Sequence, residues 1–287
     1  MSDQAAELVR TAKWDREPAR LDRALPEMGL ARSRSQAAEL IAAGRVAVDG
    51  LAAPKAGVRV TRGSTVEVTG ADHYVSRAAH KLVAGLDAFA IPVEGKLALD
   101  LGASTGGFTQ VLLEAGARQV LAIDVGHDQL VGWIRDDSRV CAVEGCNARD
   151  LTRDSLAAST GVAQSPELVV ADLSFISLRM VLPAIARVAA ADADLVLLIK
   201  PQFEVGRQGI REGIVTSPAR AAEAIRQVLA AAAELGYATH GLIPSPIAGG
   251  SGNREYVVHL VRGANPDPTE WEERVEQLTA ADATDVR

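Results

Sequence analysis

The sequence predicts an α/β protein, with a large sheet covered by helices on both faces and a small α+β domain before it. From residue 97 onward, apolar runs such as LALDLG, QVLAIDVG and DLVLLIK alternate with stretches of helical periodicity. Runs that are apolar on both faces are typical of parallel strands buried between two helical layers. The first 70 residues instead predict two short helices followed by short strands, which indicates a separate unit.

The pattern divides the chain into five parts. Residues 1–19 are expected to form a polar, poorly ordered extension, and residues 20–70 a small domain. A linker over 71–76 leads to the large domain at 77–263, and residues 264–287 are an acidic helix and tail. A unit of about 50 residues is small for an independent core, so the N-terminal domain is expected to pack on a neighbour or a ligand.

The small domain begins with two predicted helices. The first, over 21–30, contains Pro26, which removes one backbone hydrogen bond and makes the helix short or kinked. The second, over 33–44, has Ser33 and Gln36 at the spacing of a capping box. Short strands follow in RVAVDG, VRV and STVEVTG, and the Asp-Gly pair at the end of the first is a hairpin signal.

Composition excludes several classes of protein. The chain has 287 residues, and 48% of them are hydrophobic, which allows a sizeable core. We find neither an apolar run of the ~18–20 residues that a membrane span requires nor a secretory leader, so a cytoplasmic protein without a membrane partner is expected. Two cysteines make neither a disulfide framework nor a zinc site, and the five histidines are scattered, so no metal is predicted.

Charge is distributed unevenly along the chain. The net charge is −7, which by itself argues against a nucleic-acid partner. Residues 20–63, however, contain eight basic and four acidic side chains, for a net +4, whereas residues 264–287 carry −5. A basic N-terminal module that binds nucleic acid is therefore compatible with the composition.

The glycine-rich turn after the first apolar run indicates a cofactor. Ser104 replaces the second glycine of a dinucleotide fingerprint, and no lysine follows the glycines as it does in a phosphate loop. S-adenosylmethionine fits better, because Asp100 can face its ammonium group. Asp124, which lies 22 residues beyond Gly102, has the usual spacing for the acid that binds ribose hydroxyls. The alternative is a turn needed only for packing between strand and helix.

Further residues are candidates for the same cofactor site. Asn147, after the third apolar run, could meet the adenine edge. The full set of candidate cofactor ligands is Asp100, Gly102, Ser104, Gly106, Gly107, Phe108, Asp124, Asn147 and Asp172.

Four charged residues stand where chemistry is expected. Ligands of parallel sheets bind at the carboxyl ends of the strands, where VVADLSF places Asp172 and LLIKPQF places Lys200. Lys81 precedes the sheet and Glu255 precedes its last strand; each alone could equally be a solvated charge. Together they indicate methyl transfer to a hydroxyl. A lysine becomes a general base when burial or a second ammonium disfavours its charge, and Lys81 beside Lys200 would supply that second ammonium.

Two other functions remain open at this point. Methylation of a base amino group commonly uses an Asn/Asp-Pro-Pro-Tyr/Phe motif at the fourth strand; Asp172 and Phe175 match its ends, but both prolines are absent. An amine needs no buried lysine base, so Lys200 favours the hydroxyl. A non-catalytic RNA-binding protein is the second alternative, against which the intact cofactor turn argues.

Five motifs in order resemble one family. VSRAAHKL, LDLGASTGGFT, VVADLSFISL, IKPQFEVG and SGNREY are together similar to the TlyA family of rRNA 2′-O-methyltransferases, whose catalytic domain is FtsJ-like. The resemblance implies a Rossmann-like, seven-stranded S-adenosylmethionine-dependent methyltransferase sheet. It also implies a catalytic Lys-Asp-Lys-Glu tetrad at Lys81, Asp172, Lys200 and Glu255. Members of this family have also been called haemolysins, but the acidic chain has no membrane-active segment, so membrane lysis is not expected.

The same resemblance implies a substrate and an RNA-binding module. The acceptor is expected to be a cytidine ribose of rRNA within ribosomal subunits, in the large subunit at least. The family has shorter and longer members, and the longer ones also modify the small subunit. The N-terminal extension of this chain favours the longer type. DNA is not expected as a partner, and the protein is expected to be monomeric. ARSRSQAAELIAAGRVAVDG is similar to the RNA-binding fold of ribosomal protein S-four. The candidate RNA-binding residues are Arg20, Arg32, Arg34, Arg45, Lys55 and Arg77.

Overall fold

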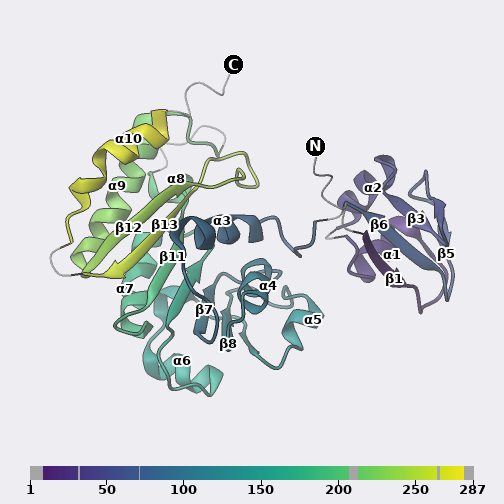
Figure 1. Cartoon of the computed structure of the whole chain (residues 1–287), viewed down its shortest axis with the longest axis horizontal. Helices are drawn as coiled ribbons and strands as arrows, with labels where there is room; N and C mark the ends of the chain where they lie inside the picture. The colour runs from purple at the N-terminus through teal and green to yellow at the C-terminus, as the bar shows by residue number, and fades with distance from the viewer. Residues whose placement is uncertain (1–8, 32, 71, 207–212, 264–265, 281–287) are drawn as a thin grey trace, which may run out of the picture. The chain divides into compact units, whose positions relative to one another are not determined.

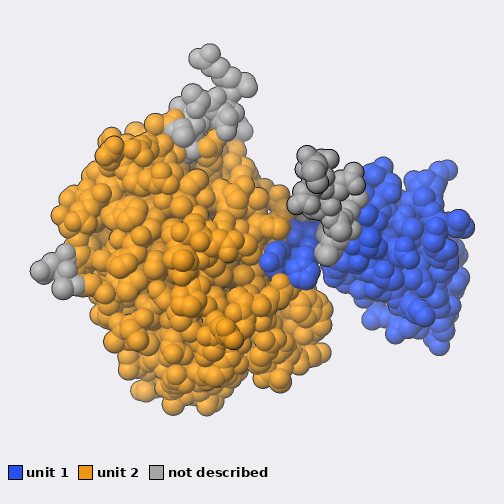
Figure 2. Space-filling view, in the orientation of Figure 1, with its two compact units in different colours: residues 1–75 blue, residues 76–287 orange. Residues whose placement is uncertain are grey.

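The computed structural model describes residues 9–31, 33–70, 72–206, 213–263 and 266–280. The chain forms two compact units, Met1–Val75 and Ser76–Arg287, which are coloured separately in Figure 2. Each unit has a hydrophobic core of its own. Arg32, a predicted RNA-binding residue, lies outside the described residues.

The first unit is a small antiparallel sheet packed on two helices (Figure 1). Its four-stranded sheet has the order β1-β6-β3-β4, and a two-stranded ribbon pairs β2 with β5. The strands are β1 (Val9–Lys13), β2 (Ala19–Arg20), β3 (Val46–Val48), β4 (Leu51–Ala52), β5 (Arg59–Val60) and β6 (Thr65–Thr69), and the helices are α1 (Leu21–Glu27) and α2 (Arg34–Ala42).

Strand β1 corrects one expectation from the sequence. We predicted a poorly ordered extension over residues 1–19, but Val9–Lys13 pairs with β6 along its whole length, from Val9 opposite Thr69 to Lys13 opposite Thr65. The strand was missed because it is an edge strand whose exposed and half-buried residues alternate without a strongly apolar face. Trp14, directly after it, is 3% exposed and belongs to the core of this unit.

The predicted helix and turn signals of this unit are confirmed. Helix α1 contains Pro26 and is short, as expected; it ends at Glu27, and Gly29, with a φ of +70°, turns the chain away while Leu30 N–H donates to the Leu25 oxygen. The Ser33 hydroxyl accepts a hydrogen bond from the backbone N–H of Gln36 at the start of α2. Asp49 and Gly50 have φ angles of +50° and +78° and join β3 to β4, as a two-residue hairpin with a type I′ turn does.

The second unit is built on a seven-stranded sheet in the order β12-β13-β11-β10-β7-β8-β9. Its strands are β7 (Leu97–Leu101), β8 (Gln119–Ile123), β9 (Val140–Val143), β10 (Leu168–Ala171), β11 (Asp194–Ile199), β12 (Tyr237–Pro244) and β13 (Tyr256–Arg262). Strands β7 to β11 run parallel, whereas β13 is antiparallel to both β11 and β12. The seven-stranded α/β fold is thus as predicted, except that its last strand reverses direction.

Helices cover both faces of this sheet (Figure 1). Helices α3 (Ala79–Phe89) and α4 (Gly107–Glu114) pack on one face, where Gly85 brings α3 so close to β13 that a Cβ would lie 2.9 Å from a methyl group of Val257. The other face is covered mainly by α7 (Leu178–Val188) and α9 (Pro218–Glu234). The remaining helices are α5 (Gly132–Arg135), η1 (Ala148–Asp150), α6 (Arg153–Thr160), α8 (Pro201–Glu204), η3 (Pro268–Trp271) and α10 (Glu272–Ala280).

The strand order creates a switch point between β7 and β10. The chain proceeds outward from β7 through β8 to β9, and from β10 through β11 in the opposite direction. At such a point the loops leave on opposite sides and open a crevice at the carboxyl ends of the strands. The crevice described below lies there.

Helix α10 packs on the core of the second unit. Val275 and Leu278 of α10 are 1% and 7% exposed, and Arg226 of α9 pairs with Glu272 at 2.6 Å. Among the described residues, none of the helices is both long enough and apolar enough to cross a bilayer.

Candidate active site

The glycine turn after β7 packs directly on the loop after β10. Gly102 has a φ of +82°, and a Cβ there would lie 2.9 Å from the backbone oxygen of Asp172. Gly106, with a φ of +99°, precedes α4, and a Cβ there would lie 2.8 Å from methyl groups of Leu130 and Ile134. Both positions therefore need glycine for backbone conformation and for space.

Asp124 shapes this turn through its carboxylate. Its Oδ2 accepts a hydrogen bond from the backbone N–H of Ser104 at 2.8 Å, and its Oδ1 accepts one from Gly126 at 2.7 Å. Ser104, which has a φ of +47°, also donates its hydroxyl to Gln129 at 3.1 Å. Each carboxylate oxygen has a further lone pair, so Asp124 can still accept hydrogen bonds from a ligand.

A cavity of about 910 Å³ opens at the switch point. Five predicted cofactor residues line it: Gly102, Ser104, Asp124, Asn147 and Asp172. Its opposite wall is apolar and aromatic and was not predicted; this wall includes Leu173, Phe175, Ile176, Met180 and Phe203. The cavity has the size and the mixed lining that small-molecule sites have.

A second cavity, of about 180 Å³, extends the site toward Lys200. Gly107 and Phe108 line it, and it shares Gly102, Ser104, Asp172 and Ser174 with the larger cavity. The region where a cofactor can bind is therefore continuous with the region where Lys200 lies.

Asp100 does not line either cavity. It is fully buried, and its Oδ2 accepts a hydrogen bond from the Thr109 hydroxyl at 2.7 Å, whereas its Oδ1 has no partner in the structure. The pKa of Asp100 is raised to about 7, mainly by burial and also by the charges of Asp172 and Asp124, against the lowering effect of the Thr109 hydrogen bond. Its place is beneath the glycine turn, tying β7 to α4, rather than in contact with the cavity as the sequence predicted. Gly106 also lines neither cavity.

The four predicted tetrad side chains converge. Lys81 Nζ from α3 lies 2.5 Å from Glu255 Oε2 and 3.5 Å from Asp172 Oδ2, and Lys200 Nζ lies 2.5 Å from Asp172 Oδ1. Lys81, Lys200 and Glu255 are 5%, 8% and 3% exposed. Asp172 thus lies between two buried ammonium groups, and the two positive and two negative charges balance. Removing any one of the four would leave an uncompensated buried charge.

Two polar residues that the sequence analysis missed contact the tetrad. Ser174 Oγ accepts a hydrogen bond from Lys200 Nζ at 3.2 Å, and Gln202 Nε2 donates to Glu255 Oε1 at 3.4 Å. Each lies two residues from a tetrad member, so proximity in the sequence was the signal that could have found them.

Glu204 holds the loop that carries Asp172 against the segment that carries Lys200. Its carboxylate accepts hydrogen bonds from the Ser177 hydroxyl at 2.5 Å, the Leu178 backbone N–H at 2.6 Å and Arg179 Nε at 3.2 Å. It thereby caps the start of α7, for which Ser177 supplies no side-chain cap. Phe175, in the same loop, has a φ of +64° and is 93% exposed. Such a backbone conformation in an aromatic residue requires support from its surroundings.

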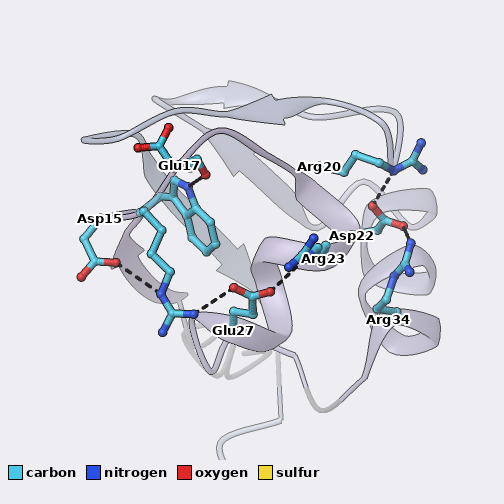
Figure 3. A network of polar contacts seen from close by, with 9 residues as sticks. Asp15, Glu17, Arg20, Asp22, Arg23, Glu27 and Arg34 are labelled. Atoms are coloured by element: carbon cyan, nitrogen blue, oxygen red, sulfur yellow. Dashed lines mark hydrogen bonds and ion pairs between the residues drawn. The ribbon is translucent and has the colours of Figure 1, made fainter.

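The predicted RNA-binding residues of the first unit are largely exposed. Arg34, Arg45 and Lys55 lie at the surface, and Arg45 donates to the Gly70 backbone oxygen at 3.0 Å. Arg20 and Arg34 both contact the carboxylate of Asp22 (Figure 3). Arg20 lies before the first turn of α1 and is held by Asp22. Arg77 is exposed in the second unit.

Comparison with known proteins assigns both units. Residues 74–262 match the model of the FtsJ-like methyltransferases, and residues 19–66 match that of the S4 domain. The chain belongs to the FtsJ-like methyltransferase family. The family is an enzyme family, and S-adenosylmethionine is the cofactor implied for this FtsJ-like methyltransferase.

Relatives of this FtsJ-like methyltransferase have two kinds of name. The "16S/23S rRNA (cytidine-2'-O)-methyltransferase TlyA" of Mycobacterium tuberculosis is 50% identical over 245 residues, covering 84% of this chain and 89% of the relative. "Hemolysin A" of Brachyspira hyodysenteriae is 37% identical over 243 residues, covering 84% of this chain and 99% of the relative. A solved structure from Streptococcus thermophilus, provisionally named a hemolysin, has a TM-score of 0.72 at 35% identity and covers 93% of this chain and 96% of its own.

The cavity fits the cofactor of the FtsJ-like methyltransferases. S-adenosylmethionine has an anionic carboxylate, a ribose diol and an adenine. The N-terminus of α4 would supply backbone donors for the first, Asp124 an acceptor for the second, and the apolar wall a surface for the third. The described residues contain no group of three or more potential metal ligands.

Proposed function

We propose that this protein transfers a methyl group to the ribose 2′-hydroxyl of cytidine in rRNA. The observation that supports the proposal most strongly is the convergence of Lys81, Asp172, Lys200 and Glu255 beside the glycine turn. The relative from M. tuberculosis is named for this reaction on both rRNAs, and one from Campylobacter jejuni, 35% identical over 191 residues, is named for it on 23S rRNA. We accordingly propose the large-subunit rRNA as a substrate and the small-subunit rRNA as a second one.

The buried lysine pair supports a role in removing the hydroxyl proton. A ribose hydroxyl is a poor nucleophile and must lose its proton as the new bond forms. In the proposal, Lys200 first releases its ammonium proton to water and then, as a neutral amine, accepts the proton of the hydroxyl. Asp172, 2.5 Å away, then stabilises the ammonium that results, while Lys81 keeps Asp172 and Glu255 in position. S-adenosylmethionine, when bound, supplies the electrophilic methyl group.

The remaining residues are assigned to binding and alignment. Gly102, Ser104, Gly107, Phe108, Asp124 and Asn147 would hold the cofactor at the switch point, and Asp100 and Gly106 would keep the turn in shape. Most of the acceleration should come from placing the hydroxyl in line with the methyl group. The S4 domain would bind phosphates through Arg20, Arg32, Arg34, Arg45 and Lys55. In the second unit, Arg77 would also bind a phosphate. Phosphate contacts position the enzyme, whereas the shape of the RNA specifies the site.

The cellular setting belongs to the same proposal. The substrate would be rRNA assembled in ribosomal subunits, bound by a monomer in the cytoplasm. Neither DNA nor a membrane would be a partner, since the site supports chemistry on a ribose hydroxyl.

The test is to map 2′-O-methyl groups on rRNA. Purified large and small subunits that lack these modifications are incubated with the protein and S-adenosylmethionine, and the modified positions are read by mass spectrometry of nuclease fragments. We expect new 2′-O-methylcytidine. Methyl groups on base nitrogen would favour an amino methyltransferase instead, and binding to subunits without any methyl transfer would favour a non-catalytic RNA-binding protein.

A further inference from the structure

Asp22 connects the starts of the two helices of the S4 domain (Figure 3). Arg20 Nε lies 3.0 Å from Asp22 Oδ1, and Arg34 Nη2 lies 2.7 Å from Asp22 Oδ2. Arg20 is the residue before α1, and Arg34 is the first residue of α2. One carboxylate therefore sets the positions of two guanidinium groups that are 14 residues apart in the sequence.

The aspartate is buried, whereas its partners are open to solvent. The Asp22 side chain is 9% exposed, and those of Arg20 and Arg34 are 60% and 65% exposed. The backbone also holds the aspartate in place. Its N–H donates a hydrogen bond to the Ala56 backbone oxygen at 3.2 Å, and the preceding residue, Leu21, is fully buried. Hydrogen bonds from Arg34 and Arg20 lower the pKa of Asp22 to about 2, so it carries its charge throughout the neutral range.

A negative charge at this place needs an explanation. Both arginines are proposed to bind rRNA phosphates, and a carboxylate between them weakens the attraction of this surface for any polyanion. Against this, a free arginine side chain samples many rotamers, and fixing it on binding costs conformational entropy. Each guanidinium has five N–H donors. One bond to Asp22 fixes its direction and leaves the others for a phosphate.

We propose that Asp22 is a positioning residue for rRNA recognition, which holds the guanidinium groups of Arg20 and Arg34 beside one carboxylate before the RNA arrives. The inference rests on the proposed function, because it presupposes that these two arginines contact RNA. Charge repulsion alone would make RNA binding tighter when the negative charge of Asp22 is removed. The positioning role predicts the opposite, a weaker binding.

The same domain contains a matched control. Glu27 also lies between two arginines, with Oε2 3.0 Å from Arg16 and Oε1 3.0 Å from Arg23 (Figure 3). It differs from Asp22 in being exposed and in holding arginines that are not among the predicted RNA-binding residues. Glu27→Gln therefore removes the same charge from the same domain without releasing Arg20 or Arg34.

The experiment measures the affinity of the full-length protein for purified large ribosomal subunits. We expect Asp22→Asn to raise the Kd by about 5-fold, while turnover at saturating subunit concentration and the affinity for S-adenosylmethionine stay as in the wild type. Glu27→Gln should leave the Kd within about twofold of the wild type or lower it. An unchanged or tighter Kd for Asp22→Asn would overturn the inference.

A second background separates positioning from folding. In the Arg20→Ala/Arg34→Ala protein, Asp22→Asn should cause no further loss of affinity, because no arginine is left to position. An equal loss in both backgrounds would mean that the aspartate only maintains the fold, and would also overturn the inference. If Asp22→Asn does not melt cooperatively, Asp22→Glu replaces it, with the same expected direction and the same contradicting result.

The controls keep this inference apart from the proposed function. If the wild type transfers no methyl group, or if Arg20→Ala/Arg34→Ala binds subunits as the wild type does, the proposed function of these residues is wrong. If both behave as proposed and only Asp22→Asn fails to weaken binding, the positioning role alone is wrong.

Discussion

Two carboxylates in this protein each lie between two cationic side chains, but the two clusters differ in burial and in the kind of cation. Asp172 lies between Lys81 and Lys200, whose side chains are 7% and 9% exposed, whereas Asp22 lies between arginines that are more than half exposed. A lysine can give up its proton, particularly when it is buried, whereas arginine keeps its charge and presents a planar fork to phosphates. The difference teaches that similar ion triads suit the two proposed tasks: moving a proton in one unit and presenting fixed charge in the other.

Replacing Lys200 is expected to have the largest effect. Both Lys200→Ala and Lys200→Arg should reduce methyl transfer by at least about 100-fold, because neither side chain can accept the hydroxyl proton at neutral pH. Single-turnover transfer of a labelled methyl group to ribosomal subunits measures this, and titration calorimetry should give a cofactor affinity close to that of the wild type.

Lys96 provides the control for that experiment. It pairs with Asp194 at 2.7 Å at the opposite end of β11, and Lys96→Arg should leave turnover nearly unchanged. Substantial turnover in Lys200→Arg would contradict the comparison between the two clusters. It would mean that the buried cluster works with an arginine, which cannot accept the hydroxyl proton.

Replacing the two exposed arginines should affect binding rather than chemistry. Arg20→Ala/Arg34→Ala is expected to weaken subunit binding by about 10- to 100-fold and to lower the slope of log Kd against log salt by about 1.4–1.8, because two phosphate contacts are lost. Filter binding at several salt concentrations gives both values. Arg34→Lys, which keeps the charge but not the fork, should lose much less. An unchanged salt slope in the double variant would contradict the assignment of this surface.

Releasing the loop that carries Asp172 should have a smaller effect on turnover. Glu204→Gln weakens the bonds that hold Ser177, Leu178 and Arg179, so Asp172 should be placed less precisely, and turnover should fall by about 10-fold. Pre-steady-state rates at saturating cofactor measure this. The exposed Glu234→Gln is the matched substitution and should turn over as the wild type does. Equal rates for the two variants would show that the cap has no part in positioning.

The ionisation of Asp100 should affect the pH dependence of stability rather than turnover. The pKa of Asp100 is about 7 in the fold against 3.8 as its ordinary value, so the folded protein holds this proton over a pH range in which the unfolded chain releases it. Stability from this group is therefore complete below about pH 4 and is lost as the pH rises toward 7, at no more than about 1.4 kcal/mol per pH unit.

The variant Asp100→Asn isolates this contribution. It keeps an acceptor for Thr109 but cannot ionise, so its free energy of unfolding should decline less between pH 5 and 7 than that of the wild type. Denaturant titrations at several pH values measure both proteins. Parallel curves would show that the carboxyl group does not titrate in this range.

Much of the fold and of the site could be predicted from local pattern. Apolar runs located β7, β8, β9, β10, β11 and β13, and the glycine turn with its acid 22 residues on located the cofactor cavity. The edge strands were harder. Strand β1 has little apolar character. Strand β12 was not identified because its alternation is interrupted where the exposed His240 and the buried Gly241 adjoin a register shift.

Other features depend on tertiary geometry that no local pattern encodes. Asp100 was expected to face the cofactor because it precedes the turn, but the alternation of side chains along β7 directs it toward α4 and Thr109. The hydrogen bond between Glu204 of α8 and the Leu178 N–H at the start of α7 joins residues that are 26 positions apart. The aromatic wall of the cavity includes Phe175, which precedes α7, and Phe203 of α8. These contacts exist only once β10 and β11 are paired.

The reversed direction of β13 has a consequence for the synthesis of the protein. Because β13 runs against β11, its first residues arrive at the edge where the parallel strands end, and Glu255 reaches Lys81 from 174 positions downstream. A nascent polypeptide that has emerged only as far as β12 has its glycine turn, both lysines and Asp172, but lacks Glu255, the nearer of the two carboxylates at Lys81. The two lysines then share one carboxylate, so the charge balance of the cluster is complete only after nearly all of the chain has been translated.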